Sequence, residues 1–270
     1  MIIGAHIPRE TTIIKTMEEI KMNDGNALQL FITNPRSSHI SDNDKYLAES
    51  HLIKKYCKQN NFSLIVHGPY VVNLAKPFLN GKKPIDVEDS IIIHDLTTAN
   101  CIGAKGYVLH VGKSTTNTIS ASLNTMKTNI KNIIAEMIKR NIKTKLLLET
   151  PAGQGTELLT DIHEFINFYY SFTEEERTVF KICIDSCHVW NSGYELNEIS
   201  NIFKNKEDVL CIHLNNSMNF KGARVDRHEN LFDGKITPND LREFAKSFDK
   251  SIIILEKPSK EYKKEIEFLK

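Results

Sequence analysis

Histidine and carboxylate residues follow most of the short apolar runs in this chain. They stand directly after six of the eight runs, as His67, His110, Glu149, Asp185, His213 and Glu256. With 10 His and 34 Asp and Glu among 270 residues, so many such endings exceed chance. Imidazole combined with carboxylate suits zinc or manganese far better than calcium or magnesium. The pattern therefore predicts a transition-metal site built at the ends of the runs.

Three further ligand-type residues follow soon after these endings. His188 lies three residues beyond Asp185, and Asp226 and His228 are separated by one residue. In an extended segment, a one-residue gap lets two side chains point to the same side and share an ion. Nine ligands are too many for one ion and suit three ions that share a bridging carboxylate.

Two nearby residues have other interpretations. His6 ends the first apolar run, and we expect it beside the metal ligands rather than among them. Cys187 precedes His188 and is either a soft metal ligand or a buried structural thiol. We favour the structural thiol, because free cysteine is usually buried.

The apolar runs alternate with longer segments of helical periodicity. Strands that are apolar on both faces and joined by helical crossovers indicate a parallel sheet covered by helices. Eight such units in about 270 residues predict a single (β/α)₈ TIM barrel, with the strand ends on its catalytic face. A doubly wound sheet is the alternative, but no Gly-x-Gly-x-x-Gly turn follows the first run. The predicted strands are Ile2–Ile3, Ala27–Phe31, Leu64–Val66, Tyr107–Leu109, Leu146–Leu148, Ile182–Ile184, Leu210–Ile212 and Ile252–Leu255.

The helical segments carry start signals and apolar faces. Ile119–Arg140 has apolar residues at helical spacing, and Ser259–Leu269 is expected to be the eighth helix. Ser41 and Asp44 form the pattern of a capping box before a helix.

Composition limits the class of protein. The 35 basic and 34 acidic residues give a net charge of +1, so no strongly basic field indicates nucleic acid. There is no apolar run of membrane-spanning length and no secretory signal pattern, and the five cysteines make a disulfide framework unexpected. We expect one domain over residues 1–270, intracellular, monomeric and without a membrane partner.

Five segments carry motifs beyond the single ligand-type residues. They lie at 66–75, 149–155, 184–188 and 213–215, and above all at 224–230, which reads Arg-Val-Asp-Arg-His-Glu-Asn. These segments resemble the endonuclease IV family of zinc-dependent apurinic/apyrimidinic (AP) endonucleases. The resemblance spans the chain from Gly4 to Glu256.

The resemblance implies three zinc ions and assigns their ligands. His67, His110 and Glu149 would hold the first ion. Glu149, bridging the first two, would hold the second with Asp185, His213 and Glu256. The third ion would be held by His188, Asp226 and His228.

The implied reaction is hydrolysis of the phosphodiester 5′ to an abasic site in double-stranded DNA. It leaves a 3′-hydroxyl and a 5′-deoxyribose phosphate, and blocked 3′ ends are a second implied substrate. Glu149 and Glu256 are the ligands expected to serve in catalysis, and manganese is an alternative to zinc at one or more positions.

The resemblance also implies DNA contacts from loops on the same face. Tyr70 would fill the space of the damaged nucleotide, since an aromatic wedge replaces lost stacking. The alternatives are a core role for Tyr70 and ion pairs with Asp226 or Glu229 for the two later arginines. The predicted contacts are Arg36, Tyr70, Val71, Asn73, Gln154, Arg224 and Arg227.

Three departures from the family pattern leave the ligands intact. Asn216 replaces a usual Asp, Leu-Phe-Asp-Gly at 231–234 replaces a usual Gly-Glu-Gly, and Lys257 replaces a usual Thr, where it is a further candidate for a phosphate contact. The competing enzyme class is a xylose-isomerase-like sugar isomerase or epimerase. That class needs only four or five metal ligands and would leave several of the nine unexplained.

Overall fold

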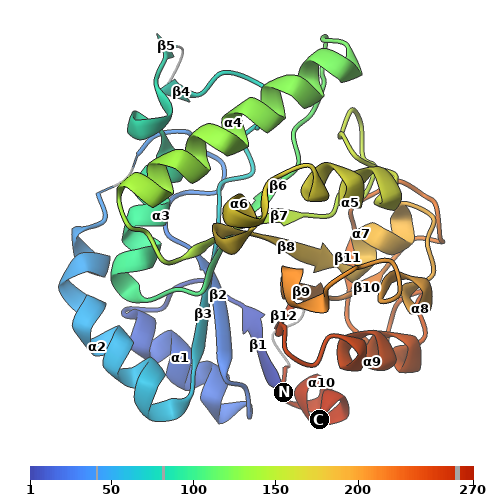
Figure 1. Ribbon diagram of the computed structural model, residues 1–270. Helices are drawn as coiled ribbons and strands as arrows, with labels where there is room; N and C mark the ends of the chain where they lie inside the picture. The colour runs from blue at the N-terminus through green and yellow to red at the C-terminus, as the bar shows by residue number, and fades with distance from the viewer. Residues whose placement is uncertain (41, 81–82, 259–261) are drawn as a thin grey trace.

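Eight parallel strands form a closed barrel in the order β1-β12-β9-β8-β7-β6-β3-β2 (Figure 1). The computed structural model describes residues 1–40, 42–80, 83–258 and 262–270. Each strand coincides with one predicted apolar run, which confirms the TIM barrel. The strands are β1 (Ile2–His6), β2 (Ala27–Phe31), β3 (Ser63–His67), β6 (Gly106–His110), β7 (Lys145–Glu149), β8 (Phe180–Asp185), β9 (Val209–Leu214) and β12 (Ile252–Leu255).

Helices connect the strands and surround the barrel (Figure 1). The predicted helix 119–140 is found as α4, one residue shorter. The α-helices are α1 (Ile13–Met22), α2 (Asp44–Asn60), α3 (Ile91–Ile102), α4 (Ile119–Lys139), α5 (Ile162–Tyr170), α6 (Glu174–Val179), α7 (Ser186–Asn191), α8 (Leu196–Ile199), α9 (Pro238–Ser247) and α10 (Lys263–Leu269). Short 3₁₀ helices cover Val87–Asp89 and Lys206–Asp208.

The capping box predicted before α2 is wrong. The helix begins at Asp44, so this residue occupies the first helical position rather than the third, and Asn43 precedes it as the cap. The Asp44 amide donates to Asp42 Oδ1 at 2.8 Å. Ser41, and residues 259–261 of the last predicted helix, lie outside the described residues.

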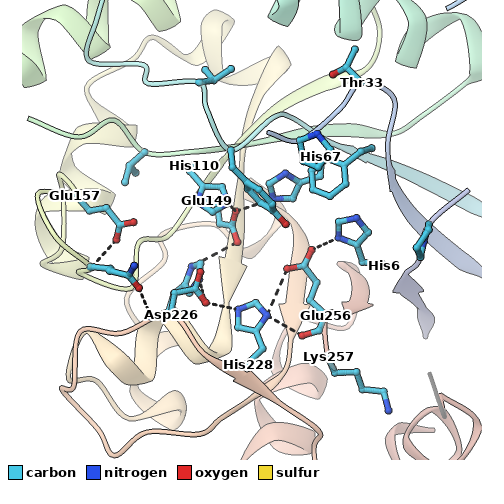
Figure 2. Close-up of a pocket in the computed structure, with 18 of the residues that line it drawn as sticks. His6, Thr33, His67, His110, Glu149, Glu157, Asp226, His228, Glu256 and Lys257 are labelled. Atoms are coloured by element: carbon cyan, nitrogen blue, oxygen red, sulfur yellow. Dashed lines mark hydrogen bonds and ion pairs between the residues drawn. The ribbon is translucent and has the colours of Figure 1, made fainter. Parts of the chain in front are cut away.

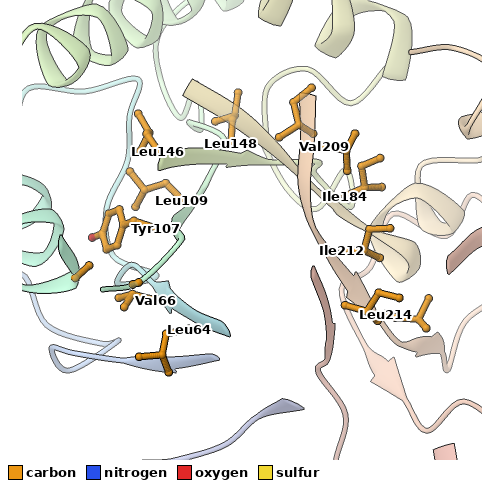
Figure 3. Close-up of a cluster of buried hydrophobic side chains, with 14 of the residues drawn as sticks. Leu64, Val66, Tyr107, Leu109, Leu146, Leu148, Ile184, Val209, Ile212 and Leu214 are labelled. Carbon is orange, nitrogen blue, oxygen red and sulfur yellow. The ribbon is translucent and has the colours of Figure 1, made fainter. Parts of the chain in front are cut away.

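Alternation along the strands separates two apolar layers. The outward residues pack against the helices and form the large core that Figure 3 shows on β3, β6, β7, β8 and β9. The inward residues fill the barrel as a separate cluster. This inner cluster consists of Ala27, Ile65, Val108, Leu147, Cys183, Cys211, Ile252 and Ile254.

Two short antiparallel strand pairs lie outside the main sheet. One pairs β4 (Leu79–Asn80) with β5 (Lys83–Pro84), and the other pairs β10 (Asn216–Ser217) with β11 (His228–Glu229). Among the helices that the structure describes, none is both long and apolar enough to cross a membrane.

Candidate metal centre

The six strand-end residues form one layer at the carboxyl end of the barrel, here called the ligand layer. Each lies two residues after a member of the inner apolar cluster, so the pleat turns it toward the barrel axis. The register places His110 beside Glu149 and Asp185 beside His213 on neighbouring strands. Above the layer opens a cavity of about 860 Å³ (Figure 2).

Glu149 is shared by two groups of possible ligands. Its Oε2 lies 3.4 Å from His67 Nε2 and 3.3 Å from His110 Nε2. This oxygen is buried and has no hydrogen-bond partner among the described residues. Two ligands of a tetrahedral zinc ion lie about 3.3 Å apart, given Zn–N and Zn–O bonds of about 2.0–2.1 Å. The three atoms are therefore spaced to hold one cation.

A second group surrounds the ring of His213. His213 Nδ1 lies 2.8 Å from Glu149 Oε1, 3.5 Å from Glu256 Oε2 and 3.9 Å from Asp185 Oδ2. His213 and Asp185 are fully buried. Three carboxylates around one imidazole nitrogen suit a divalent cation, because buried like charges need a counter-charge.

The third group lies beside the second. Asp226 Oδ1 is 3.4 Å from His188 Nε2 and 3.1 Å from His228 Nε2, and the latter is 3.5 Å from Asp185 Oδ2. His188 Nε2 is buried and lacks a hydrogen-bond partner within the described ranges. All nine predicted ligands thus lie in three adjoining groups.

Backbone carbonyls orient three of the imidazoles. The Nδ1 of His67 faces Gly68 O at 2.8 Å, that of His188 faces Thr150 O at 2.8 Å, and that of His228 faces Glu256 O at 2.9 Å. A carbonyl oxygen only accepts, so each ring carries its proton on Nδ1 and presents Nε2 toward the cavity.

The clustered charges shift the ionisation of the site. Burial alone would raise the pKa of Glu149, but the imidazoles of His110 and His213 lower it well below its usual range. Burial opposes charge on His228, yet Asp185 and Asp226 raise its pKa to about 9. The carboxylates and imidazoles of these groups therefore act on each other's ionisation through the short distances between them.

The residues with open interpretations take clear positions. His6 Nδ1 lies 2.7 Å from Glu256 Oε1, beside the ligand groups as predicted. Cys187 is fully buried and its Sγ receives a hydrogen bond from Asn191 Nδ2 at 3.2 Å. Burial raises the pKa of this thiol to about 12, and its Sγ also lies within 4.8 Å of ligand atoms of Asp185 and His228.

The sequence prediction missed Gln29. This residue lies two positions after Ala27 of the inner cluster, and its side chain enters the ligand layer, where it contacts His213. The sequence prediction considered only the residue that follows each apolar run. Counting every second residue of β2 from Ala27 would have identified Gln29 as facing the barrel axis.

Among the predicted DNA contacts, Tyr70 and Gln154 line the cavity, and Arg36, Val71 and Arg227 are each next in sequence to a residue that lines it. Arg224 lies against Gly153, which precedes Gln154. Tyr70 is 54% exposed and lines the cavity, with its ring edge-on to those of His67 and His110. Val71 is 48% exposed, and Arg36, Arg224 and Arg227 are exposed as well. None of the carboxylates in the described ranges forms an ion pair with Arg224 or Arg227. These five residues are here called the rim.

The two amides proposed to contact DNA are already hydrogen-bonded. Asn73 donates to Lys113 O and accepts from Lys113 N, both at 2.9 Å, and so joins two loops. Gln154 lines the cavity, and its Oε1 accepts from the Asp226 amide at 3.0 Å. Gln154 therefore supports the segment that carries the third ligand group.

Two of the departures from the family pattern serve structural contacts. Lys257 Nζ lies 2.6 Å from Glu265 Oε2 with both side chains buried, so the proposed phosphate contact is not supported. Asn216 Nδ2 donates to Leu231 O and Ile236 O, each at 2.8 Å. A Cβ on Gly234 would lie 2.3 Å from Asn216 Oδ1, which explains the glycine.

Comparison with known proteins identifies the family to which this barrel belongs. Residues 18–270 match the family described as xylose isomerase-like TIM barrel. A probable endonuclease 4 of Mycoplasmopsis agalactiae is 31% identical over 95% of this chain and 91% of its own length. The chain belongs to the endonuclease IV family of xylose isomerase-like TIM barrels. This endonuclease IV homologue is therefore an enzyme of the endonuclease type.

Solved structures agree on the fold. Endonuclease IV from Thermus thermophilus superposes with a TM-score of 0.77 at 22% identity, covering 100% of this chain and 97% of that one. A D-tagatose 3-epimerase-like protein superposes with a TM-score of 0.72 at 16% identity, covering 100% and 96%. The barrel alone thus does not separate a nuclease from a sugar epimerase.

Proposed function

We propose that this endonuclease hydrolyses the phosphodiester 5′ to abasic sites in double-stranded DNA. The observation that carries the proposal is the set of three adjoining ligand groups joined by Glu149 and Asp185. Cations held by these groups would place several positive charges beside a phosphodiester, as stabilisation of a pentacoordinate phosphate requires. The expected products are a 3′-hydroxyl and a 5′-deoxyribose phosphate.

Three zinc ions fit the donor set, with manganese as the alternative at one or more positions. The unpartnered Glu149 Oε2 and His188 Nε2 support this assignment, because buried polar atoms in proteins normally have partners. The proposed ligand sets are His67, His110 and Glu149; Glu149, Asp185, His213 and Glu256; and His188, Asp226 and His228. Bound together, such ions supply a water nucleophile at neutral pH and neutralise phosphoryl charge.

Residues of the chain position these events. Glu149 offers its two carboxylate oxygens to different ligand groups and so fixes their separation. Glu256 lies between His213 and His6. Its Oε2 faces His213 Nδ1 at 3.5 Å, and its Oε1 is hydrogen-bonded to His6 Nδ1 at 2.7 Å. Both carboxylates are therefore fixed before substrate arrives, which reduces the reorganisation that the transition state requires.

The rim supplies recognition of damaged DNA. Tyr70 projects at the cavity mouth, where its ring would occupy the stacking space left by the missing base. Arg36, Arg224 and Arg227 would neutralise backbone phosphates and make binding depend on salt concentration. Val71 extends the apolar wedge, while Asn73 and Gln154 would act through the loops that they support.

The same geometry favours a second activity on blocked 3′ ends. A damaged 3′ terminus also presents a phosphodiester or phosphate beside a gap in base stacking, so the rim and the three ligand groups fit it equally. A sugar isomerase or epimerase would use one group of four or five ligands. That function leaves His188, Asp226 and His228 without a role.

A direct assay separates these functions. The test substrate is a labelled duplex that carries one abasic site. The zinc-loaded protein should cut the damaged strand immediately 5′ to that site, and an excess of zinc chelator should abolish the cut. Elemental analysis should find three zinc ions per chain. One tightly bound ion with full activity would reject the trinuclear assignment, and no incision of the abasic duplex would reject the function.

A further inference from the structure

Gln29 occupies the place that β2 contributes to the ligand layer. Its side chain is fully buried, and it points inward because Ala27, two residues before it, belongs to the inner cluster. The same two-residue step leads from Ile65 to His67 and from Cys211 to His213. An amide therefore stands among imidazoles and carboxylates at the level where the metal ions are proposed to bind.

The chemistry of its neighbours determines how this amide is oriented. Gln29 Nε2 contacts Glu256 Oε1, and an ionised carboxylate only accepts hydrogen bonds. The amide nitrogen must therefore face Glu256, which leaves Gln29 Oε1 to face His213 Nε2 at 2.9 Å. Because an amide oxygen also only accepts, the His213 proton must be on Nε2.

His213 is reversed with respect to three other imidazoles of the site. His67, His188 and His228 are held through Nδ1 by backbone carbonyls and present Nε2. His213 is held through Nε2 by Gln29 and presents Nδ1 toward Glu149, Glu256 and Asp185. The acceptor that fixes the protonated ring nitrogen is thus a side chain, Gln29, in the case of His213, and a backbone carbonyl for the other three imidazoles.

We propose that Gln29 is a positioning residue for the second metal ion. Its Oε1 holds the proton of His213 on Nε2 and leaves the Nδ1 lone pair for the ion, while its Nε2 holds Glu256 in place. Partners of this kind raise metal affinity by about 10- to 100-fold. The inference rests on the proposed function, since it assumes that His213 and Glu256 bind the same ion.

Zinc binding by matched variants tests the role. Gln29→Met keeps the length of the side chain and removes both hydrogen bonds, and Gln29→Asn keeps an amide that is too short to reach both partners. The control is Thr144→Val, which removes a buried hydrogen bond, from Thr144 Oγ1 to Ala104 O at 2.8 Å, just before β7 at the other end of the barrel. Zinc affinity is measured by competition with a chelator, and bound zinc by elemental analysis.

We expect both Gln29 variants to bind one zinc ion about 10- to 100-fold more weakly than the natural chain. Thr144→Val should lower the melting temperature without changing zinc affinity, which separates positioning from general loss of packing. Natural zinc affinity in a folded Gln29 variant would overturn the proposal.

A spectroscopic measurement on the natural protein applies even if the variants do not fold. Ring ¹⁵N shifts of zinc-loaded protein should show His213 protonated at Nε2 and bound to metal through Nδ1. A proton on Nδ1 would reject the role of Gln29. If the natural chain neither binds zinc nor nicks abasic DNA, the proposed function itself fails, whereas normal zinc binding by Gln29→Met alone rejects only this inference.

Discussion

The ligand layer and the rim occupy the same end of the barrel but are built differently. Glu149, Asp185 and His213 are buried and linked to one another, and strand pleat and register fix them. Tyr70 and Val71 are about half exposed and sit on a loop beyond β3. The layer is formed by contacts within the protein, whereas the rim faces solvent and is proposed to contact DNA. Substitutions in the layer should therefore abolish chemistry, and substitutions in the rim should alter binding.

The largest effect is expected for Glu149→Gln. The change removes the charge shared by two ligand groups, so incision of abasic DNA should fall by about 10³-fold or more, because the ions and the nucleophile lose their position. The test is the single-turnover rate of incision, and the amount of bound zinc is measured on the same samples. Asp208→Asn, a buried carboxylate that accepts from Tyr169 and Tyr170, is the control and should stay active. Near-natural incision by Glu149→Gln would contradict the shared-ligand role.

Tyr70→Ala should have an intermediate effect confined to recognition. Loss of the ring should reduce the preference for abasic over intact duplex about tenfold, since aromatic stacking on a base is worth about 1–3 kcal/mol. Competition binding with the two duplexes measures the preference. Tyr70→Phe keeps the ring and should behave as the natural protein, with zinc content the same in all three. An unchanged preference in Tyr70→Ala would assign the ring to packing.

Arg224→Ala and Arg227→Ala should weaken binding a few-fold on damaged and intact duplex alike. Each loss should reduce the slope of log affinity against log salt by about 1, as for one phosphate contact. Titrations at several salt concentrations give that slope. Lys250→Ala is the control, because Lys250 lies away from the cavity and pairs with Glu207 at 2.7 Å. A slope equal to that of the natural protein would place both arginines outside the DNA interface.

The smallest effect on activity is expected for Asn73→Ala. Its amide joins two loops through two hydrogen bonds to Lys113, so the free energy of unfolding should fall by about 2 kcal/mol, at about 1 kcal/mol for each bond. Denaturant unfolding measures this, and incision should stay within about threefold of natural. A large loss of DNA affinity with unchanged stability would instead restore Asn73 as a direct contact.

Periodicity and residue type were sufficient to predict much of this protein. Apolar runs with helical crossovers predicted the eight barrel strands, and the residues after the runs predicted the ligand layer. Both depend on local rules, since the pleat alternates and the carboxyl ends of parallel strands meet at one face. His188, Asp226 and His228 were also found from spacing. The DNA contacts and the metal count stay predictions until they are measured.

Tertiary structure decided what depends on contacts between distant segments. Lys257 was a candidate for a phosphate contact, and only the fold shows that Glu265 binds it in a buried pair. Asn73 was a candidate for DNA, and its amide is bound to Lys113. Gln29 contacts Glu256 and His213, which are 227 and 184 residues away. Alternation along a strand determines which residues face the axis, but closure of the barrel decides which of them meet.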